Sequence, residues 1–197
     1  MNATILEKQP NTGPTKNKIH PQKFALWVGC ASIVMMFAGF TSAFVVRRAA
    51  GNWLEFDLPG LFFWNTALIL LSSVVLHLSY ISFKKNNFSR YRTLLVIGSM
   101  MAVGFVVLQV MAWEKMTEMG IYLTGNPSGS FVYVISGIHA AHVLGGICAL
   151  AIALIHAFSL KDLATPKRIH RLDLTVTYWH FVDLLWVYLI GFLVLNS

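Results

Sequence analysis

Charged side chains are scarce in this sequence of 197 residues. Only 12% of the residues are Asp, Glu, Lys or Arg, while 56% are hydrophobic; an average soluble domain carries about 25% charged residues. A soluble domain needs a polar surface, and a disordered chain needs low hydrophobicity, so both classes are excluded. The composition therefore predicts a protein whose solvent is the lipid bilayer.

Motifs for common enzymatic chemistry are also missing. The two cysteines, Cys30 and Cys148, lie in separate apolar runs without CxxC or zinc-type spacing, which argues against a disulfide framework and against a metal site. There is no glycine-rich phosphate loop, no Ser-His-Asp arrangement and no pair of carboxylates within one apolar run. These absences argue against nucleotide binding, hydrolysis and acid–base catalysis by this chain.

Long apolar runs are what the sequence does contain. Five of them are near or above the ~20 residues that cross the hydrocarbon core as a helix. Their apolar character runs round all faces, which argues against helices lying on the membrane surface. We predict an all-α integral membrane bundle of five transmembrane helices, with a polar tail at residues 1–23 and a single domain at 24–197. The predicted spans are 24–46, 61–83, 94–113, 131–158 and 174–195.

The basic residues are distributed unequally between the two sides of this predicted bundle. Assigning the loops alternately places twelve Lys and Arg on one side and only Arg47, Arg48 and Lys115 on the other. The positive-inside rule then predicts a cytoplasmic N-terminus and a periplasmic C-terminus. The net charge of +7 thus reflects topology. Because no basic stripe interleaved with aromatics is present, nucleic acid is not an expected partner.

A few ionisable side chains lie within the apolar segments, where each needs a partner or a role. At ~1.5 Å per residue, His142 and Asp183 fall about 11 and 12 residues from the outer ends of antiparallel spans, at similar depth. We therefore predict a buried hydrogen-bonded network that joins His139 or His142 to Asp183.

Further polar side chains are candidates for a polar pocket inside the membrane. By the same depth measure, His77 and His180 both fall in the inner third, which allows them to share such a pocket. Gln109 and Glu114, near the outer end of the third span, are further candidates. For a lone histidine such as His77, a core residue bonded to a carbonyl one turn back is the favoured interpretation.

Two other function classes remain open at this point. His142 and His156 are separated by 13 residues, which places them on nearly one helix face about 21 Å apart, as two stacked b-type haems would require. No other span repeats that spacing to supply the second axial ligands. A transporter or channel that uses Asp183 and the histidines is the other alternative, although the spans lack paired Gly/Pro-broken segments.

The last two spans also carry distinctive motifs. Residues 178–186 read YWHFVDLLW, and residues 137–146 read GIHAAHVLGG. They resemble the YWHFVDxxW and GxHxxHVxxG motifs of subunit III of cytochrome c oxidase and related haem–copper terminal oxidases. Gln109, Trp113 and Gly120 are similar to the end of that family's central helix, and NT at residues 65–66 followed by LLSS at 70–73 resembles its bacterial members. The span count is similar to that of the short, five-helix bacterial form.

This resemblance implies an accessory, non-redox subunit of a proton-pumping oxygen reductase in the bacterial cytoplasmic membrane. It implies direct packing on oxidase subunit I, association with subunit II and other respiratory subunits, and haem and copper on those partners rather than on this chain. It also implies a bound phospholipid and support for oxygen access and proton uptake. The electron donor, cytochrome c or quinol, stays open. The positions carried over as a structural network are His139, His142, Trp179, His180, Asp183 and Trp186.

The chain departs from the family pattern in its first span and in its length. Many members carry a glutamate a few residues before a Gly-Phe pair, whereas here only apolar residues and Ser32 precede Gly39-Phe40. The longer form has two additional helices at its N-terminus that form one wall of a lipid cleft.

Small residues are expected where helices approach closely. We assign this packing role to Gly39, Ala43, Gly145 and Gly146. Replacement of Gly145 by Leu is accordingly expected to weaken assembly.

Overall fold

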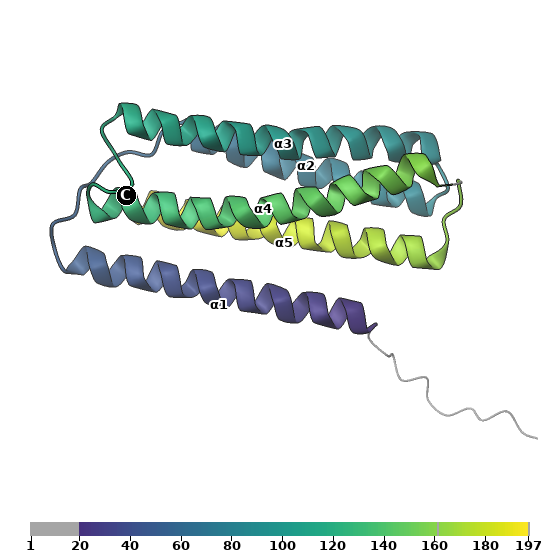
Figure 1. Ribbon diagram of the computed structural model, residues 1–197, viewed down its shortest axis with the longest axis horizontal. Helices are drawn as coiled ribbons and strands as arrows, with labels where there is room; N and C mark the ends of the chain where they lie inside the picture. The colour runs from purple at the N-terminus through teal and green to yellow at the C-terminus, as the bar shows by residue number, and fades with distance from the viewer. Residues whose placement is uncertain (1–19, 161, 197) are drawn as a thin grey trace, which may run out of the picture.

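Five long α-helices make up the protein, seen in a computed structural model that describes residues 20–160 and 162–196 (Figure 1). All five are long and apolar enough to cross a membrane, and the described ranges contain no β-strand. The predicted all-α architecture of five spans is confirmed. The helices are α1 (Pro21–Ala49), α2 (Leu61–Lys84), α3 (Phe88–Glu118), α4 (Pro127–Ser159) and α5 (Pro166–Asn196).

Each helix contains its predicted span and extends beyond it at one end or both. The extension is largest on α3, predicted at 94–113 and observed at Phe88–Glu118. Hydropathy marks the part of a helix in hydrocarbon, whereas helical hydrogen bonds continue through the polar interface. The predicted tail at 1–23 is too long for the same reason, because α1 already begins at Pro21. Residues 1–19 of that tail lie outside the described residues.

A heptad-like seam joins α2 to α3. Buried residues recur on both helices at alternating intervals of three and four positions, the spacing that favours left-handed packing at a shallow crossing angle. Gly98 permits close approach here, since a Cβ atom on it would lie 2.6 Å from Cδ2 of Leu76. The seam consists of Phe62, Asn65, Ile69, Ser72, Leu76, Ser79 and Phe83 on α2, and of Tyr91, Leu95, Gly98, Ala102, Phe105, Gln109, Ala112 and Met116 on α3.

The turn between α2 and α3 is fixed by local chemistry. Asn86 adopts a positive φ of 57°, a conformation that Asn tolerates better than most residues. Its N–H donates to Phe83 O and that of Asn87 to Ser82 O, both at 3.0 Å. This pair of bonds is the Schellman motif that satisfies the last carbonyls of a helix. Asn87 then caps α3 by accepting from the Arg90 N–H, so three residues suffice to reverse the chain.

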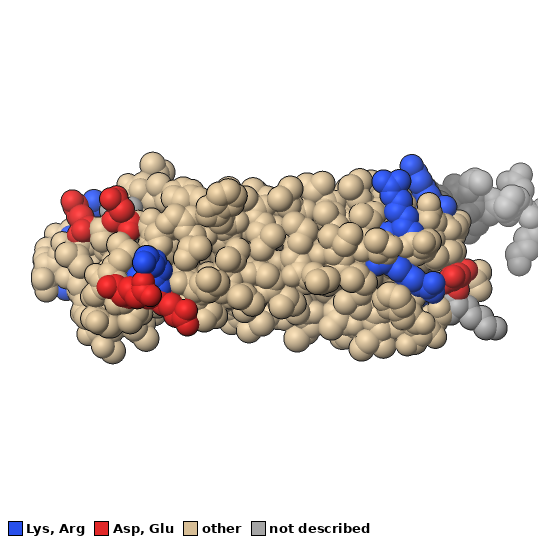
Figure 2. Space-filling model, turned by 90° about the horizontal axis from the view of Figure 1, so that it is seen from above, with Lys and Arg blue, Asp and Glu red and all other residues tan. Residues whose placement is uncertain are grey.

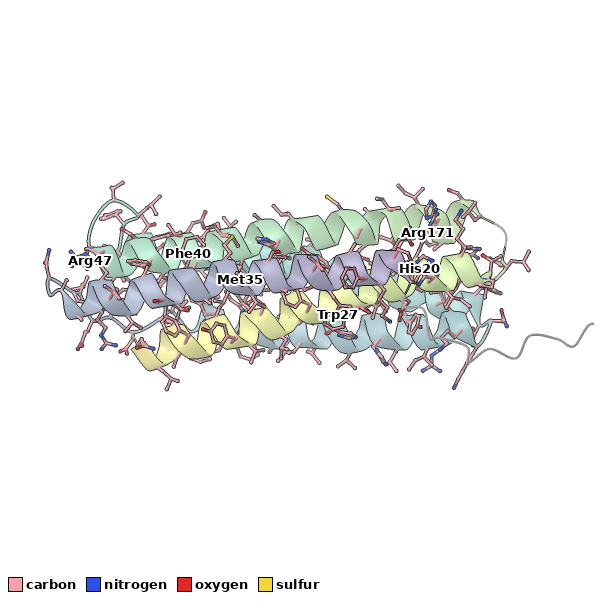
Figure 3. The ribbon with its side chains drawn as sticks, turned by 90° about the horizontal axis from the view of Figure 1, so that it is seen from below. His20, Trp27, Met35, Phe40, Arg47 and Arg171 are labelled. Carbon is pink, nitrogen blue, oxygen red and sulfur yellow. The ribbon has the colours of Figure 1, made fainter. Side chains whose placement is uncertain are left out.

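The helix α1 lies at the periphery of the bundle formed by the other four. It contacts α4 and α5 and no other described helix, and in Figure 1 it runs along one edge of the molecule. Phe44 is buried against Phe131 of α4 and Phe192 of α5. Along the outer side, Trp27 and Met35 are exposed (Figure 3).

Two of the four predicted packing residues lie on this outer side of α1. Gly39 and Ala43 are both exposed, and a Cβ atom on Gly39 would meet nothing within 4 Å. The prediction that they mediate helix contacts is therefore wrong within this chain. Bulky buried side chains, Phe37 and Phe44, form the contact of α1 with its neighbours instead.

Charged side chains gather at the two ends of the bundle and leave an uncharged belt between them (Figure 2). We call the end at which α1 begins the basic end; it carries Lys84, Lys85, Arg90, Arg92, Lys167, Arg168 and Arg171. The opposite end carries Glu55, Asp57, Glu114 and Glu118 together with Arg47, Arg48 and Lys115. Because consecutive helices are antiparallel, the alternating assignment of loops is correct.

Candidate functional site

The YWHFVDLLW segment of α5 turns both of its tryptophans and its aspartate into the bundle, together with Val182 and Leu185. Trp179, Asp183 and Trp186 are all buried. Their spacing of four and three positions places them on one face of the helix. This face packs between α2 and α4, so these three residues form part of the interior of the protein.

Trp186 is the centre of an aromatic cluster. Its side chain is completely buried, and its indole Nε1–H donates to Thr66 Oγ1 of α2 at 3.0 Å. Its ring stacks with His139 of α4 at a centroid distance of 4.8 Å and meets Phe105 of α3 edge to face at 5.3 Å. One side chain thus holds four helices together.

His139 is held by rings rather than by hydrogen bonds. It is fully buried, and neither ring nitrogen has a hydrogen-bond partner within the described part of the chain. In addition to Trp186, the rings of Phe37 and Phe105 lie edge-on to it at 6.5 and 6.0 Å. The imidazole therefore serves as a flat packing surface between α1, α3 and α5.

The predicted hydrogen bond between Asp183 and His139 or His142 is not formed. Neither carboxyl oxygen of Asp183 has a hydrogen-bond partner among the described residues. Nδ1 of His142 lies 2.8 Å from the carbonyl oxygen of Ile138, one turn back. Equal depth means only that two residues lie at the same position along the bundle axis. Whether their side chains face each other depends on the rotation of each helix about its own axis, which packing sets. Here the stack of Trp186 on His139 decides that rotation.

Of the two interpretations left open for His77, the structure favours the pocket shared with His180 over a core residue bonded to a carbonyl one turn back. Nδ1 of His77 lies 3.2 Å from Nε2 of His180. The other ring nitrogen of His180, Nδ1, is hydrogen-bonded to Oγ of Ser73. The three side chains link α2 to α5 near the basic end of the bundle.

The other polar-pocket candidates lie elsewhere. Gln109 is buried and accepts a hydrogen bond from Nδ2 of Asn65 at 2.9 Å. Asn65 and His77 are twelve positions apart on α2, which corresponds to about 18 Å along the helix. Glu114 is exposed at the opposite end from His77. The structure therefore does not bring His77, Gln109 and Glu114 together.

Sequence reasoning missed the polar contacts of the α2–α3 seam. Besides the Asn65 bond, Ser72 donates to the Gly98 carbonyl and Ser79 to the Tyr91 carbonyl, each at 3.1 Å. A signal for them exists in the sequence, because Asn65, Ser72 and Ser79 recur every seven residues on an apolar helix. Small polar residues at that spacing mark helix–helix interfaces in membranes.

Gly146 marks the closest approach of α4 to α5. A Cβ atom there would lie 2.9 Å from Cε3 of the buried Trp179 ring. Its predicted packing role is confirmed. Gly145 is exposed, and its Cβ atom would meet only Tyr178 Oη at 3.8 Å, an ordinary contact. Among the described residues, Gly145 therefore has no close contact.

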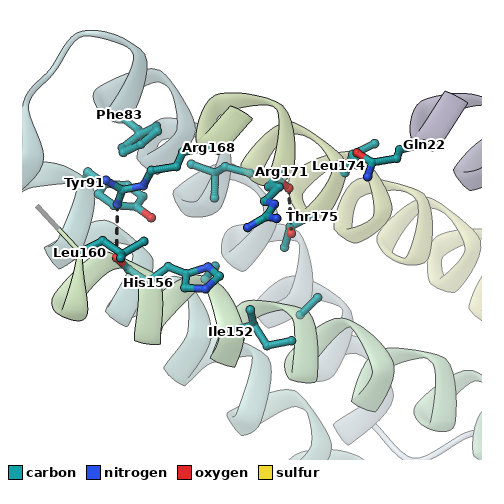
Figure 4. Close-up of a pocket in the computed structure, with 13 residues that line it drawn as sticks. Gln22, Phe83, Tyr91, Ile152, His156, Leu160, Arg168, Arg171, Leu174 and Thr175 are labelled. Carbon is teal, nitrogen blue, oxygen red and sulfur yellow. Dashed lines mark hydrogen bonds between the residues drawn. The ribbon is translucent and has the colours of Figure 1, made fainter. Parts of the chain in front are cut away.

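A cavity of about 490 Å³ opens at the basic end between α4, α5 and the start of α1 (Figure 4). Its walls include the apolar side chains of Phe83, Ile152 and Leu172. Two charged side chains, Arg168 and Arg171, also line it. Arg168 is fixed in place, since its guanidinium donates to the carbonyls at 156 and 163 at 3.2 and 2.9 Å. Such a combination suits an amphiphile with an anionic head group.

Together, antiparallel apolar helices and an interior of packed aromatic and imidazole side chains define a multi-pass helical membrane protein. Residues 52–195 match the sequence profile of the family described as "Cytochrome c oxidase subunit III". The chain belongs to this family, whose members are subunits of an enzyme complex that also contains other subunits. The described residues hold no group of three or more His, Cys, Asp or Glu placed to bind a metal ion.

Individual relatives are similar over most of their length. The chain is 29% identical over 172 residues to the probable cytochrome c oxidase subunit 3 of Nocardia farcinica, covering 82% of this chain and 80% of the relative. It is 27% identical over 181 residues to cytochrome c oxidase subunit 3 of Bacillus subtilis, covering 88% and 84%. It is 28% identical over 179 residues to that of Thermostichus vulcanus, covering 86% of each chain.

Proposed function

We propose that this chain is the accessory, non-redox subunit III of an aerobic terminal oxidase that reduces oxygen to water and pumps protons. The observation that carries the proposal is the placement of the family's motif residues. Trp179, Asp183 and Trp186 build the bundle interior instead of lining an accessible catalytic cleft. The chain would then act by packing against a catalytic partner subunit and not by carrying out chemistry itself.

The proposed partners are oxidase subunit I, by direct packing, and subunit II. Those partners would carry haem and copper. The belt without charged residues in Figure 2 includes many exposed large hydrophobic side chains, on which membrane helices of subunit I can pack. A rigid bundle on that surface would keep the oxygen path and the proton entry of subunit I intact over many turnovers. The proposed location is the bacterial cytoplasmic membrane, with the basic end in the cytoplasm, and cytochrome c as the electron donor named for the relatives.

The test is to purify the tagged chain from membranes in mild detergent. We expect a much larger haem- and copper-bearing subunit to co-purify. When this chain is stripped off, we expect the activity of the remaining oxidase to decay faster during turnover. An unchanged lifetime would contradict the protective role. Purification of the chain alone, with an Asp183→Asn-sensitive transport current, would favour a transporter, and a haem spectrum of the isolated chain would favour a b-type cytochrome.

We also propose that the cavity of Figure 4 holds a phospholipid. Its apolar wall would take an acyl chain, and Arg171 would lie near the phosphate. Replacement of Arg171 by Gln removes the charge while leaving Arg168, with its backbone contacts, in place. We expect about a fivefold lower amount of co-purified anionic phospholipid per chain, since one basic residue near a lipid surface is worth about 1 kcal/mol.

The matched control is Arg90→Gln. Arg90 is exposed at the same end of the bundle but does not line the cavity. Mass spectrometry of lipids retained by the purified complex measures both variants. Equal lipid loss from the two variants would show a general charge effect and contradict a site at the cavity.

A further inference from the structure

His77 is an ionisable side chain exposed within the membrane-spanning part of the bundle. It lies seven residues before Lys84, the last residue of α2, about 10 Å deeper along the helix. In the other spans, His139 and Asp183 are buried at comparable or greater depth, while His142 is partly buried and bonded to its own helix. His77 therefore stands out among the ionisable groups of the spans.

The His77 ring lies 5.3 Å from the ring of His180 and 6.4 Å from that of Tyr80, and its polar contact with the described chain is made through Nδ1. Nδ1 contacts His180, whose other nitrogen is taken by Ser73. Nε2 of His77 has no hydrogen-bond partner among residues 20–160 and 162–196. Lipid chains offer none either, and ionisable residues in transmembrane segments almost always face protein or water. The outward side of His77 thus requires a polar group from outside this chain.

The surroundings of His77 indicate what kind of molecule supplies that group. Leu70 and Val74 precede it on the same side of α2, and Leu184 and Val187 follow His180 on α5; all four are exposed. We call these residues with His77 the His77 face. An apolar strip with one hydrogen-bonding group at the limit nearest the basic end matches a transmembrane helix that carries a complementary polar side chain. It does not match a soluble protein or a lipid head group.

We infer that the His77 face is the surface on which a transmembrane helix of the large catalytic oxidase subunit docks, with a polar side chain of that helix bonded to Nε2 of His77. This inference rests on the proposed function. Behind the interface, the chain of bonds through His180 to Ser73 orients the His77 ring from within the bundle. The face lies between α2 and α5, on the other side of the four-helix bundle from α3 and α4, because those four helices contact one another in cyclic order.

Photo-crosslinking in intact membranes tests the position of the interface. A benzophenone amino acid replaces Leu184, which is 71% exposed on the His77 face, or Met100, which is 69% exposed on α3. We expect Leu184 to capture the haem-bearing large subunit and Met100 not to do so. Capture from position 100 but not from 184 would overturn the inference and leave the proposed function standing. If no oxidase subunit is captured from either position and none co-purifies, the proposed function fails as well.

Substitution of His77 tests the hydrogen bond itself. We expect His77→Leu to lower the fraction of this subunit retained on the complex after detergent extraction by about fivefold, the effect of one interhelical hydrogen bond in a membrane. His77→Gln, which keeps a donor and an acceptor, is expected to restore most of it. Ser73→Ala removes the internal end of this chain of bonds but leaves Nε2 of His77 in place, so its loss of retention is expected to be smaller than that of His77→Leu. Full retention with His77→Leu would overturn the inference.

Discussion

Replacement of Trp186 by Ala is expected to lower the free energy of unfolding of the chain by about 3 kcal/mol. The indole is completely buried and contacts His139 and Phe105 from two other helices. Its removal leaves a large cavity and deprives Thr66 of a hydrogen-bond donor. The expected value lies at the low end for such a truncation, because a membrane supplies little hydrophobic driving force between helices and lost packing dominates.

Circular dichroism of the chain in mixed micelles, titrated with SDS, measures this change. The matched control is Trp64→Ala, since Trp64 lies on the outside of α2 with 73% of its surface exposed. That substitution removes the same number of atoms without opening a cavity, and its effect should stay within about 0.5 kcal/mol. Similar losses for both variants would contradict the assignment of Trp186 as the central packing residue.

The second large effect is expected for Gly146→Ala. The added methyl group would lie 2.9 Å from the Trp179 ring, which is buried and has no room to turn. Overpacking of this kind costs about 1–3 kcal/mol, more than the ~1 kcal/mol that Ala gains over Gly from helix propensity. A net destabilisation of about 1 kcal/mol follows. In the same SDS titration, it should appear as separation of α4 from α5 at a lower fraction of SDS.

The neighbouring Gly145→Ala is the control for the glycine pair. Its methyl group has free space beside Tyr178, so only the propensity gain remains, and the chain should become as stable or slightly more stable. If Gly145→Ala lowered the stability of the chain and Gly146→Ala did not, Gly145 would be the tight contact between the helices instead of Gly146. Any effect of Gly145→Leu on the assembled oxidase would then have to arise within this chain.

Much of the architecture could be predicted because it depends on local properties of the chain. A helix is required wherever an apolar run of about twenty residues must satisfy its backbone hydrogen bonds in lipid. The turn at Asn86 and Asn87 depends on which residues tolerate a positive φ and cap a helix. The alternation of the loops between the basic end and the opposite end follows from counting spans. The pairing of His77 with His180 was allowed by their equal depth, and it forms because α2 and α5 are neighbours.

The amino-acid sequence by itself determined the number of helices, their antiparallel order, the depth of each polar side chain and, through the motifs on the last two spans, the family. Only the tertiary structure decided which groups at equal depth meet. It placed the Trp186 ring against His139, left Asp183 without the expected imidazole, paired Gln109 with Asn65 and turned Gly39 outward. The reason is that depth follows from chain length and a fixed rise per residue, whereas the rotation of each helix about its axis is set by the summed packing of all its neighbours.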